Sequence, residues 1–236
     1  SIRAINAGIL FLFSGVMCPF IYDIRAFAGQ LVDYGLLKKS WLSRIVIFLE
    51  KVLIKKSSGI VVLDKSGSYY LKNNFKINVP IKIIPTSTNI KKFKENFDTK
   101  DKVTSPQELK FVFLGGAQFP YLPKKALEFV NLLLENDIDC SIDIINKTHQ
   151  KFVNQVIDEL DFPKNKIRIF SLKPTQIFNK LPSYDCGLVF IQTGIWIKMS
   201  SPTKIGEYLA AGLHLVGLEG IEAVSYTHLT LPTIGC

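Results

Sequence analysis

Short apolar runs alternate with amphipathic runs along most of the chain, and this alternation restricts the possible fold more than any other feature of the sequence. Short apolar runs are typical of strands buried on both faces, and amphipathic runs are typical of helices that cover such a sheet. Because strands that alternate with helices form parallel sheets, the sequence predicts an α/β protein. Its 236 residues are enough for one or two domains with buried cores.

A charged stretch divides this alternation into two parts. Residues 89–109 are polar, rich in lysine and without a clear hydrophobic period, which predicts a linker between domains. In residues 1–88 the predicted helices are 4–17, 36–56 and 65–73, and the predicted strands are 19–23, 59–63 and 81–84. In residues 110–223 the predicted strands are 111–114, 140–145, 166–170, 186–191 and 213–216, separated by helices at 123–135, 149–160, 174–181 and 202–211. The second set predicts a Rossmann-like domain.

The two ends of the sequence need separate interpretation. Residues 4–22 are apolar over a length that could span a membrane, but Pro19 would break such a helix, so a helix followed by a strand is predicted. No small-residue cleavage site indicates a signal peptide. Residues 224–236 contain no Asp, Glu, Lys or Arg and no helical period. We expect them to be a non-native tail, with a native β-rich tail as the alternative.

Metal and disulfide chemistry are not indicated. The four cysteines, Cys18, Cys140, Cys186 and Cys236, are far apart and form no Cys-x-x-Cys pair. Neither a disulfide framework nor a zinc ribbon has such spacing. The three histidines are also widely separated, so no metal site is predicted. A reducing cytosol is the expected compartment.

The net charge of +9 is unevenly distributed. Residues 1–100 contain 16 Lys and Arg against 6 Asp and Glu, whereas residues 101–236 contain 13 against 14. A basic half favours an anionic partner such as a nucleic acid, a membrane surface or a ligand, although a merely solvated basic face has the same composition. In helix 36–56, apolar residues recur at helical spacing between lysines. We expect this apolar face to cover a sheet, with membrane contact as the alternative.

The most informative stretch is residues 198–212, which carries unusually clear helix-end signals. Ser201 suits the N-cap, Pro202 the first helical position and Gly212 the residue after the last turn. Lys204 then falls in the first turn, where a cation opposes the positive end of the helix dipole. A phosphate bound at the helix start would remove this conflict, because free N–H groups and the ammonium would both face the anion.

Glu207 lies on the same predicted helix face as Lys204, three residues further on. Its carboxylate could accept hydrogen bonds from the paired hydroxyls of a sugar. A phosphate-binding group beside a hydroxyl-binding group describes a nucleotide site. The alternative is a surface helix in which Lys204 and Glu207 form an ion pair worth a few tenths of a kcal/mol.

Three segments carry a family resemblance. Residues 201–213 closely resemble the donor-binding helix of glycosyltransferase family 4. Residues 84–90, followed by Phe93, are similar to the Ile-Pro-Asn-Gly-Val-Asp segment of that family, and residues 21–27 are similar to its Asp-x-Arg-Gly segment. Their order and spacing also match, so the resemblance covers residues 1–223.

The resemblance implies a retaining, nucleotide-sugar-dependent enzyme of the GT-B fold with two Rossmann-like parallel-sheet domains, the first incomplete. Residues 1–88 would be the carboxyl-terminal part of the acceptor-side domain and residues 110–223 a truncated donor-binding domain. Sugar would pass from a nucleotide diphosphate sugar to the hydroxyl of a saccharide or lipid-linked acceptor. No cofactor and no metal ion are expected. The pathway implied is cell-surface polysaccharide or lipid-linked saccharide synthesis, in the cytoplasm or on the inner face of a membrane.

The resemblance also assigns residues to roles. Lys204 would stabilise charge on the departing diphosphate and Glu207 would hold the ribose, so these two form the predicted catalytic set. Asp23 and Arg25 would lie on the acceptor side, or pair with each other. The predicted nucleotide-binding residues, of which the glycines could equally form an ordinary turn, are Ser200, Ser201, Thr203, Gly115 and Gly116.

Several positions depart from the family pattern. Met199 stands where many members have a Glu that contacts the donor sugar, which leaves the identity of the sugar open. Asn89, Ala26 and His214 replace the usual Asp, Gly and Pro. Complete members are longer on both sides, so an inactive fragment remains an alternative. Two other functions also remain: another GT-B enzyme such as an epimerase, and a non-catalytic basic module; binding of nucleic acid is not expected.

Overall fold

The computed structural model of the chain describes residues 5–15, 18–33, 35, 38–94, 108–117, 119–192, 194, 199 and 201–218. The described chain forms two compact units, each built around a parallel sheet, and the predicted α/β class is confirmed. The first unit includes Ser1–Thr86 and Gly194–Ser201, and the second includes Ser87–Thr193 and Pro202–Glu219. The predicted tail, residues 224–236, and residues 95–107 of the predicted linker lie outside the described residues.

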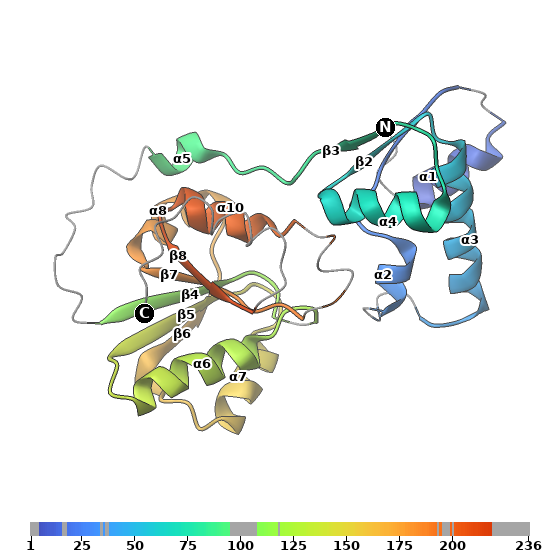
Figure 1. Cartoon of the computed structure of the whole chain (residues 1–236). Helices are drawn as coiled ribbons and strands as arrows, with labels where there is room; N and C mark the ends of the chain where they lie inside the picture. Colours follow the sequence, from blue (N-terminus) through green and yellow to red (C-terminus); the bar gives the residue numbers. More distant parts are fainter. Residues whose placement is uncertain are drawn as a thin grey trace. The chain divides into compact units, whose positions relative to one another are not determined.

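The second unit contains a five-stranded parallel sheet with the strand order β6-β5-β4-β7-β8. Helices α6 and α7 cover one face of the sheet, and α8 and α10 lie on the other (Figure 1). The strands are β4 (Leu109–Leu114), β5 (Cys140–Ile145), β6 (Ile167–Phe170), β7 (Cys186–Val189) and β8 (His214–Gly217). The helices are α5 (Ile90–Lys94), α6 (Pro123–Glu135), α7 (Gln150–Glu159), α8 (Pro174–Lys180) and α10 (Thr203–Ala210), with short 3₁₀ turns at Lys164–Lys166 and Leu181–Ser183.

Apolar side chains of β4 and β5 form the centre of the second unit. Phe113 and Ile144 on these strands pack with Leu127 and Val130 of α6, and the exposed fraction of each is 2% or less. Burying a large apolar side chain contributes roughly 1.5 to 3 kcal/mol. This core holds β4 in the middle of the sheet. The loop that follows β4 begins at the carboxyl end of this strand.

The strand order creates a reversal point beside β4. The chain runs from β4 outward through β5 to β6 and then returns to the other side of β4 to form β7 and β8. Ligands of open α/β sheets bind beyond the carboxyl ends of the strands at such a reversal. The loop after β4 and the first turn of α10 lie at this edge.

The first unit has a three-stranded parallel sheet in the order β1-β2-β3. Asp64, the N-cap of α4, accepts a hydrogen bond from the Gly67 N–H at 2.7 Å, and this contact fixes the start of that helix. The strands are β1 (Ile21–Asp23), β2 (Gly59–Val62) and β3 (Ile81–Ile83), and the helices are α1 (Ile5–Phe13), α2 (Ala28–Asp33), α3 (Trp41–Lys56) and α4 (Lys65–Phe75).

The predicted packing face of helix 36–56 is buried only in part. In α3, Leu53 of the predicted apolar face is buried, whereas Ile45 and Leu42 of that face are 43% and 53% exposed. Ser43 and Glu50 are buried instead. The reason is that polar side chains on the inner face find partners. Ser43 Oγ donates to the Ser40 carbonyl, and Glu50 accepts hydrogen bonds within the unit. The apolar period therefore located the buried face of the carboxyl-terminal half of this helix but not that of its first turns.

No helix in the described part of the chain is both long enough and apolar enough to cross a lipid bilayer. The helix Ile5–Phe13 followed by the strand Ile21–Asp23 agrees with the predicted interpretation of the apolar amino-terminal run.

Candidate nucleotide-binding site

The amino end of α10 lacks the predicted cap. The N-cap residue is Pro202, not Ser201, and no side chain caps the first turn. Ser201 instead contacts Thr86 in the first unit: the Thr86 hydroxyl lies 2.6 Å from the Ser201 carbonyl and 2.7 Å from its hydroxyl. The carboxyl end is as predicted, because Gly212 follows the C-cap with φ +74°. The first-turn N–H groups are thus left without a side-chain cap.

Tyr208 fixes α10 against the end of β4. Its hydroxyl accepts a hydrogen bond from the Leu114 N–H at 2.8 Å and donates to the Val112 carbonyl at 3.3 Å. Its ring occupies the space that a side chain at Gly187 on β7 would take, since a Cβ there would lie 2.4 Å from the ring. The fully buried Tyr208 therefore determines where the first turn of α10, one helical turn earlier, meets the β4 loop.

Lys204 extends from the first turn of α10 to the residue that follows β4. Gly115 has φ +104°, a conformation that favours glycine, and a Cβ at this position would lie 2.5 Å from Lys204 Cε and 2.8 Å from Nζ. The space beside Gly115 is therefore filled by the lysine side chain. Next to it, a Cβ at Gly116 would lie 3.1 Å from the Tyr121 ring. The structure thus brings Gly115, Gly116 and Lys204 together.

The ammonium group of Lys204 is buried in an aromatic environment. Its Nζ lies 3.4 Å from the centroid of the Tyr121 ring and 5.7 Å from that of Phe113. Among the described residues it has no hydrogen-bond partner. Burial lowers the pKa of Lys204 to about 7, and the Glu207 carboxylate opposes this shift. Ring faces attract a cation but supply no oxygen acceptor, so the three N–H donors remain available.

Glu207 does not pair with Lys204. Lys204 Nζ is buried and has no hydrogen bond to this carboxylate. This contradicts the alternative of an i, i+3 ion pair on a surface helix. Glu207 is half-buried, and burial raises its pKa, while the Lys204 ammonium acts in the opposite direction. Within the part of the chain that the structure describes, nothing donates to this carboxylate, so its oxygens can accept from another donor. Nothing in the structure tests its predicted contact with a ribose, which stays a prediction.

The loops after β4 and β5 are joined by Asn146, which is 2% exposed. Its side-chain amide donates to the Gly115 carbonyl, and its Oδ1 accepts from the N–H groups of Thr148 at 2.9 Å and His149 at 2.6 Å. His149 Nδ1 in turn accepts from the Ala117 N–H at 3.5 Å. Because these bonds cross-link two loops, the unusual backbone of Gly115 is held in place.

Gly206 gives α10 a second close contact within the second unit. A Cβ at Gly206 would lie 2.6 Å from the Thr88 hydroxyl oxygen. Thr88 belongs to the predicted Ile-Pro-Asn-Gly-Val-Asp-like segment, residues 84–90. The Thr203 side chain is exposed at the start of the helix, and its predicted part in nucleotide binding stays a prediction, as does that of Ser201.

The remaining predicted residues lie in or near the first unit. Asp23 is buried and forms a two-pronged ion pair with Arg25, with Oδ1 2.8 Å from Nε and Oδ2 3.0 Å from Nη2. This is the pairing that the sequence left open as the alternative to an acceptor-side role. Met199 is buried in the apolar core of the first unit. Ser200 lies outside the described residues.

Three residues of this site were missed by sequence analysis. Tyr121, Asn146 and Tyr208 hold Lys204, the β4 loop and α10 respectively, and the sequence analysis gave none of them a role. Tyr121 and Lys204 are far apart in the sequence and come into contact only in the folded chain, so the sequence alone does not indicate this contact. A weak signal was available for Asn146, because a side chain that follows directly after a buried parallel strand lies at the ligand-binding edge.

The described residues contain no group of three or more His, Cys, Asp or Glu side chains placed to hold a metal ion.

Comparison with known proteins gave no matching family model and no matching curated protein. Solved structures do match. HepE from Anabaena, solved with UDP and glucose, superposes with a TM-score of 0.62 at 12% identity, over 94% of this chain and 58% of HepE.

Two further solved structures give the same result. Sucrose-phosphate synthase from Thermosynechococcus elongatus matches with a TM-score of 0.61 at 10% identity, over 92% of this chain and 55% of the synthase. WaaG, a glycosyltransferase involved in lipopolysaccharide biosynthesis, matches with a TM-score of 0.60 at 12% identity, over 89% of this chain and 60% of WaaG.

This chain has the GT-B fold. The GT-B assignment predicted from residues 201–213 is confirmed at the level of fold, because identities this low establish architecture alone. The chain spans between 55% and 60% of the length of these three glycosyltransferases. In GT-B terms, the Lys204 site is at the carboxyl edge of the second Rossmann-like sheet.

Proposed function

We propose that the chain is the part of a glycosyltransferase that binds a nucleoside diphosphate sugar and carries the donor-side chemistry of sugar transfer. The observation that carries this proposal is the buried Lys204 ammonium, which has no hydrogen-bond partner among the described residues. A buried cation without an acceptor is costly to folding, so a protein keeps one where a ligand supplies the missing charge. At the uncapped start of α10, a diphosphate is the ligand that satisfies both the ammonium and the free backbone N–H groups.

Lys204 would stabilise the leaving group in this reaction. As the bond between the anomeric carbon and the diphosphate oxygen breaks, negative charge develops on the diphosphate. An ammonium held in place by Gly115 and Tyr121 before the reaction begins meets that charge without reorganisation. A well-placed donor of this kind is worth roughly 2 to 4 kcal/mol of transition-state stabilisation. Because the lysine supplies the positive charge, the proposal requires no metal ion.

Glu207 would hold the nucleoside. Its carboxylate lies one helical turn after Lys204, has no ion pair with it and retains acceptor oxygens for the two ribose hydroxyls. HepE has been solved with UDP and with UDP-glucose, which makes UDP the natural first probe. The proposal includes transfer with retention to an acceptor hydroxyl of a saccharide or lipid-linked acceptor, in cell-surface polysaccharide or lipid-linked saccharide synthesis.

Calorimetric titration of the chain with UDP tests the site. We expect saturable binding that weakens at least tenfold in Lys204→Ala and in Glu207→Ala. Matched controls are Lys151→Ala on α7 and Glu135→Ala at the end of α6, both exposed residues of the same charge in the same unit. Unchanged UDP affinity in both site variants would remove the assignment.

An activity assay of the chain tests the reaction class. With UDP-sugars and saccharide acceptors, a transferase releases free UDP only in proportion to the acceptor glycosylated. Epimerisation would change the sugar while it stays attached to the nucleotide and would need no acceptor. Proton NMR of the product distinguishes the α- from the β-anomer and so tests retention.

A further inference from the structure

The serine hydroxyl that the sequence assigns to the cap of α10 is bonded elsewhere. Serine followed by proline is a common helix start, with serine as the N-cap and proline as the first helical residue. In the structure Pro202 is itself the N-cap, and the Ser201 hydroxyl lies 2.7 Å from the Thr86 hydroxyl. Thr86 also donates to the Ser201 carbonyl at 2.6 Å. Thr86 and Ser201 both belong to the first unit, and each is followed directly by a residue of the second.

Pro202 is one backbone rotation away from the capped arrangement. Its φ of −62° is already that of a helical residue, and only its ψ of 120° keeps it outside α10. Rotation of ψ to about −40° would make Pro202 the first helical residue and Ser201 the N-cap. The Ser201 hydroxyl would then accept from the N–H of Thr203 or Lys204. The hydrogen bonds with Thr86 hold Ser201 away from this position.

The segment that carries Thr86 is fixed on both sides. Before it, the Ile84 N–H donates to the Val62 carbonyl at 2.8 Å, which extends the pairing of β3 with β2. After it, Thr88 lies against α10, where a Cβ at Gly206 would come within 2.6 Å of the Thr88 hydroxyl oxygen. Contacts two residues away in each direction therefore hold Thr86 in place.

An uncapped first turn suits the anion proposed for this site. A serine cap occupies a backbone N–H that a bound phosphate also uses, so the cap and the ligand compete. The buried Lys204 ammonium, which has no hydrogen-bond partner among the described residues, needs an acceptor at the same end of the helix. A diphosphate offers several charged oxygens, whereas a serine hydroxyl is one neutral acceptor. Holding the serine away leaves the first turn and the ammonium free for a single ligand.

We propose that Thr86 is a positioning residue of the nucleotide site: its hydroxyl withholds the Ser201 cap from α10 and so keeps the first-turn N–H groups free for the diphosphate. This inference rests on the proposed binding of a nucleoside diphosphate. Thr86 does not contact the ligand and acts through Ser201. Without the Thr86 hydroxyl, Ser201 caps the helix, and UDP has to displace the cap in order to bind.

Calorimetric titration with UDP measures the effect of the hydroxyl. Thr86→Val keeps the shape of the side chain and should weaken UDP binding by about 3- to 30-fold, the range expected for a competing serine cap. Thr86→Ser keeps the hydroxyl and should bind UDP as the parent does. The matched control is Thr175→Val, which removes a hydroxyl from an exposed position on α8 and should also retain the affinity of the parent. Unchanged affinity in Thr86→Val would overturn the proposal.

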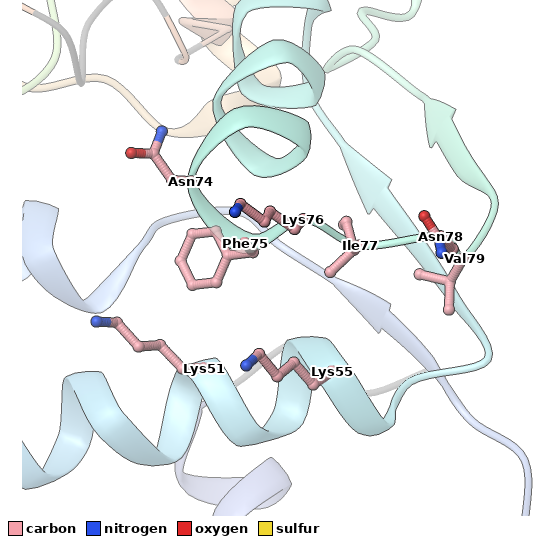
Figure 2. Close-up of a pocket in the computed structure, with 8 residues that line it drawn as sticks. All are labelled: Lys51, Lys55, Asn74, Phe75, Lys76, Ile77, Asn78 and Val79. Carbon is pink, nitrogen blue, oxygen red and sulfur yellow. The ribbon is translucent and has the colours of Figure 1, made fainter.

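The titration needs a control for UDP bound elsewhere. A pocket of about 610 Å³ in the first unit is lined by three lysines and by no acidic side chain among the described residues. Figure 2 shows two of them, Lys51 and Lys55, extending from α3 toward the segment that carries Lys76. The triple variant Lys51→Gln, Lys55→Gln, Lys76→Gln should keep the UDP affinity and its response to Thr86→Val. Loss of that response would place UDP in the pocket and overturn the proposal.

A second background separates the cap from a general loss of packing. In Ser201→Ala no hydroxyl is left to cap α10. Adding Thr86→Val to this variant should therefore change its UDP affinity by less than about twofold, whatever that affinity is. If Thr86→Val has as large an effect in Ser201→Ala as in the parent, Thr86 acts on the site by another route and the proposal is wrong.

NMR of the ligand-free chain tests the cap without UDP. In Thr86→Val, the amide proton of Thr203 or Lys204 should exchange more slowly with solvent than in the parent, and the Pro202 ¹³Cα shift should move toward its helical value. Both changes should disappear when Ser201→Ala is added. Their absence from Thr86→Val itself would overturn the proposal even if UDP binds. If they are present but the parent does not bind UDP, the withheld cap stands and the proposed nucleotide site is wrong.

Discussion

Lys204 in the second unit and Glu50 in the first unit are both ionisable, both buried and both have a pKa of about 7, yet their surroundings differ. Glu50 accepts hydrogen bonds from the Ala28 N–H at 2.9 Å and from the Tyr22 hydroxyl at 3.3 Å. Lys204 has no such partner among the described residues. Burial is the main cause of both pKa shifts, so the shift alone does not identify a binding site. The unpaired N–H donors of Lys204 identify the binding site.

The largest effect that tests this comparison is expected for Lys204→Met. Removing the ammonium should weaken UDP binding by about 10- to 150-fold, because hydrogen bonds to a charged group contribute about 1.5 to 3 kcal/mol. The same change should stabilise the ligand-free protein by about 1 to 3 kcal/mol, since it removes a buried unpaired cation. Calorimetry and urea unfolding measure the two quantities. A destabilised Lys204→Met chain would mean that the ammonium serves the fold, as the hydrogen bonds accepted by Glu50 do.

The next effect concerns the glycine that makes room for the lysine. Gly115→Ala places a methyl group 2.5 Å from Lys204 Cε and strains a backbone with φ +104°, so UDP affinity should fall by about tenfold and stability by about 1 to 3 kcal/mol.

Gly35→Ala is the matched control for that substitution. Gly35 has φ +69° and nothing within 4 Å of the added Cβ, so it incurs the backbone strain without displacing a side chain. It should lose stability but keep UDP affinity. Equal loss of affinity in both variants would show that strain, and not the displacement of Lys204, affects the site.

The smallest effect is expected for Glu50→Gln. The pKa of Glu50 is raised on folding from 4.5 to about 7, so folding retains its proton and the resulting stability is present below pH 4.5 and is lost as the pH rises through about 7. Glutamine keeps an acceptor for Ala28 without the charge. Glu50→Gln should therefore be more stable than the parent at pH 8 by about 1 to 3 kcal/mol and should differ little at pH 4.

UDP binding by Glu50→Gln should equal that of the parent, because Glu50 lies in the first unit. Chemical unfolding at the two pH values, with UDP titration as the control, measures this. A variant that is less stable than the parent at pH 8 would show that the carboxylate charge itself supports the fold.

The sequence predicted the second unit well for a physical reason. Helix α6 and strand β5 have the predicted bounds, and α10 differs by one residue at each end, because the apolar periods there report true burial. The same criterion succeeded only in part for α3, where Leu53 is buried but the core face also contains Ser43 and Glu50, and large apolar side chains such as Trp41 and Phe48 are exposed. Periodicity locates an apolar face but does not say whether protein or another surface covers it.

The candidate site was only partly predictable. Lys204 was identifiable because a cation in the first turn of a helix opposes the helix dipole. Gly212 was identifiable because the residue that follows a helix often has a positive φ, which favours glycine. The N-cap was placed one residue early because the Ser201 hydroxyl has a distant partner, Thr86. Tyr121 and Asn146 were not predicted, since their importance arises only when loops after different strands meet.

The most direct test of the account is the titration of Lys204 itself, followed by NMR through its ¹³Cε resonance with and without UDP. In the free chain the ammonium should titrate near pH 7, and with UDP bound its pKa should rise by more than one pH unit, because the diphosphate stabilises the charged form. A Lys204 that titrates near 10.5 in the free chain, or whose titration is unchanged by saturating UDP, would contradict the claim that this lysine is buried to receive a diphosphate.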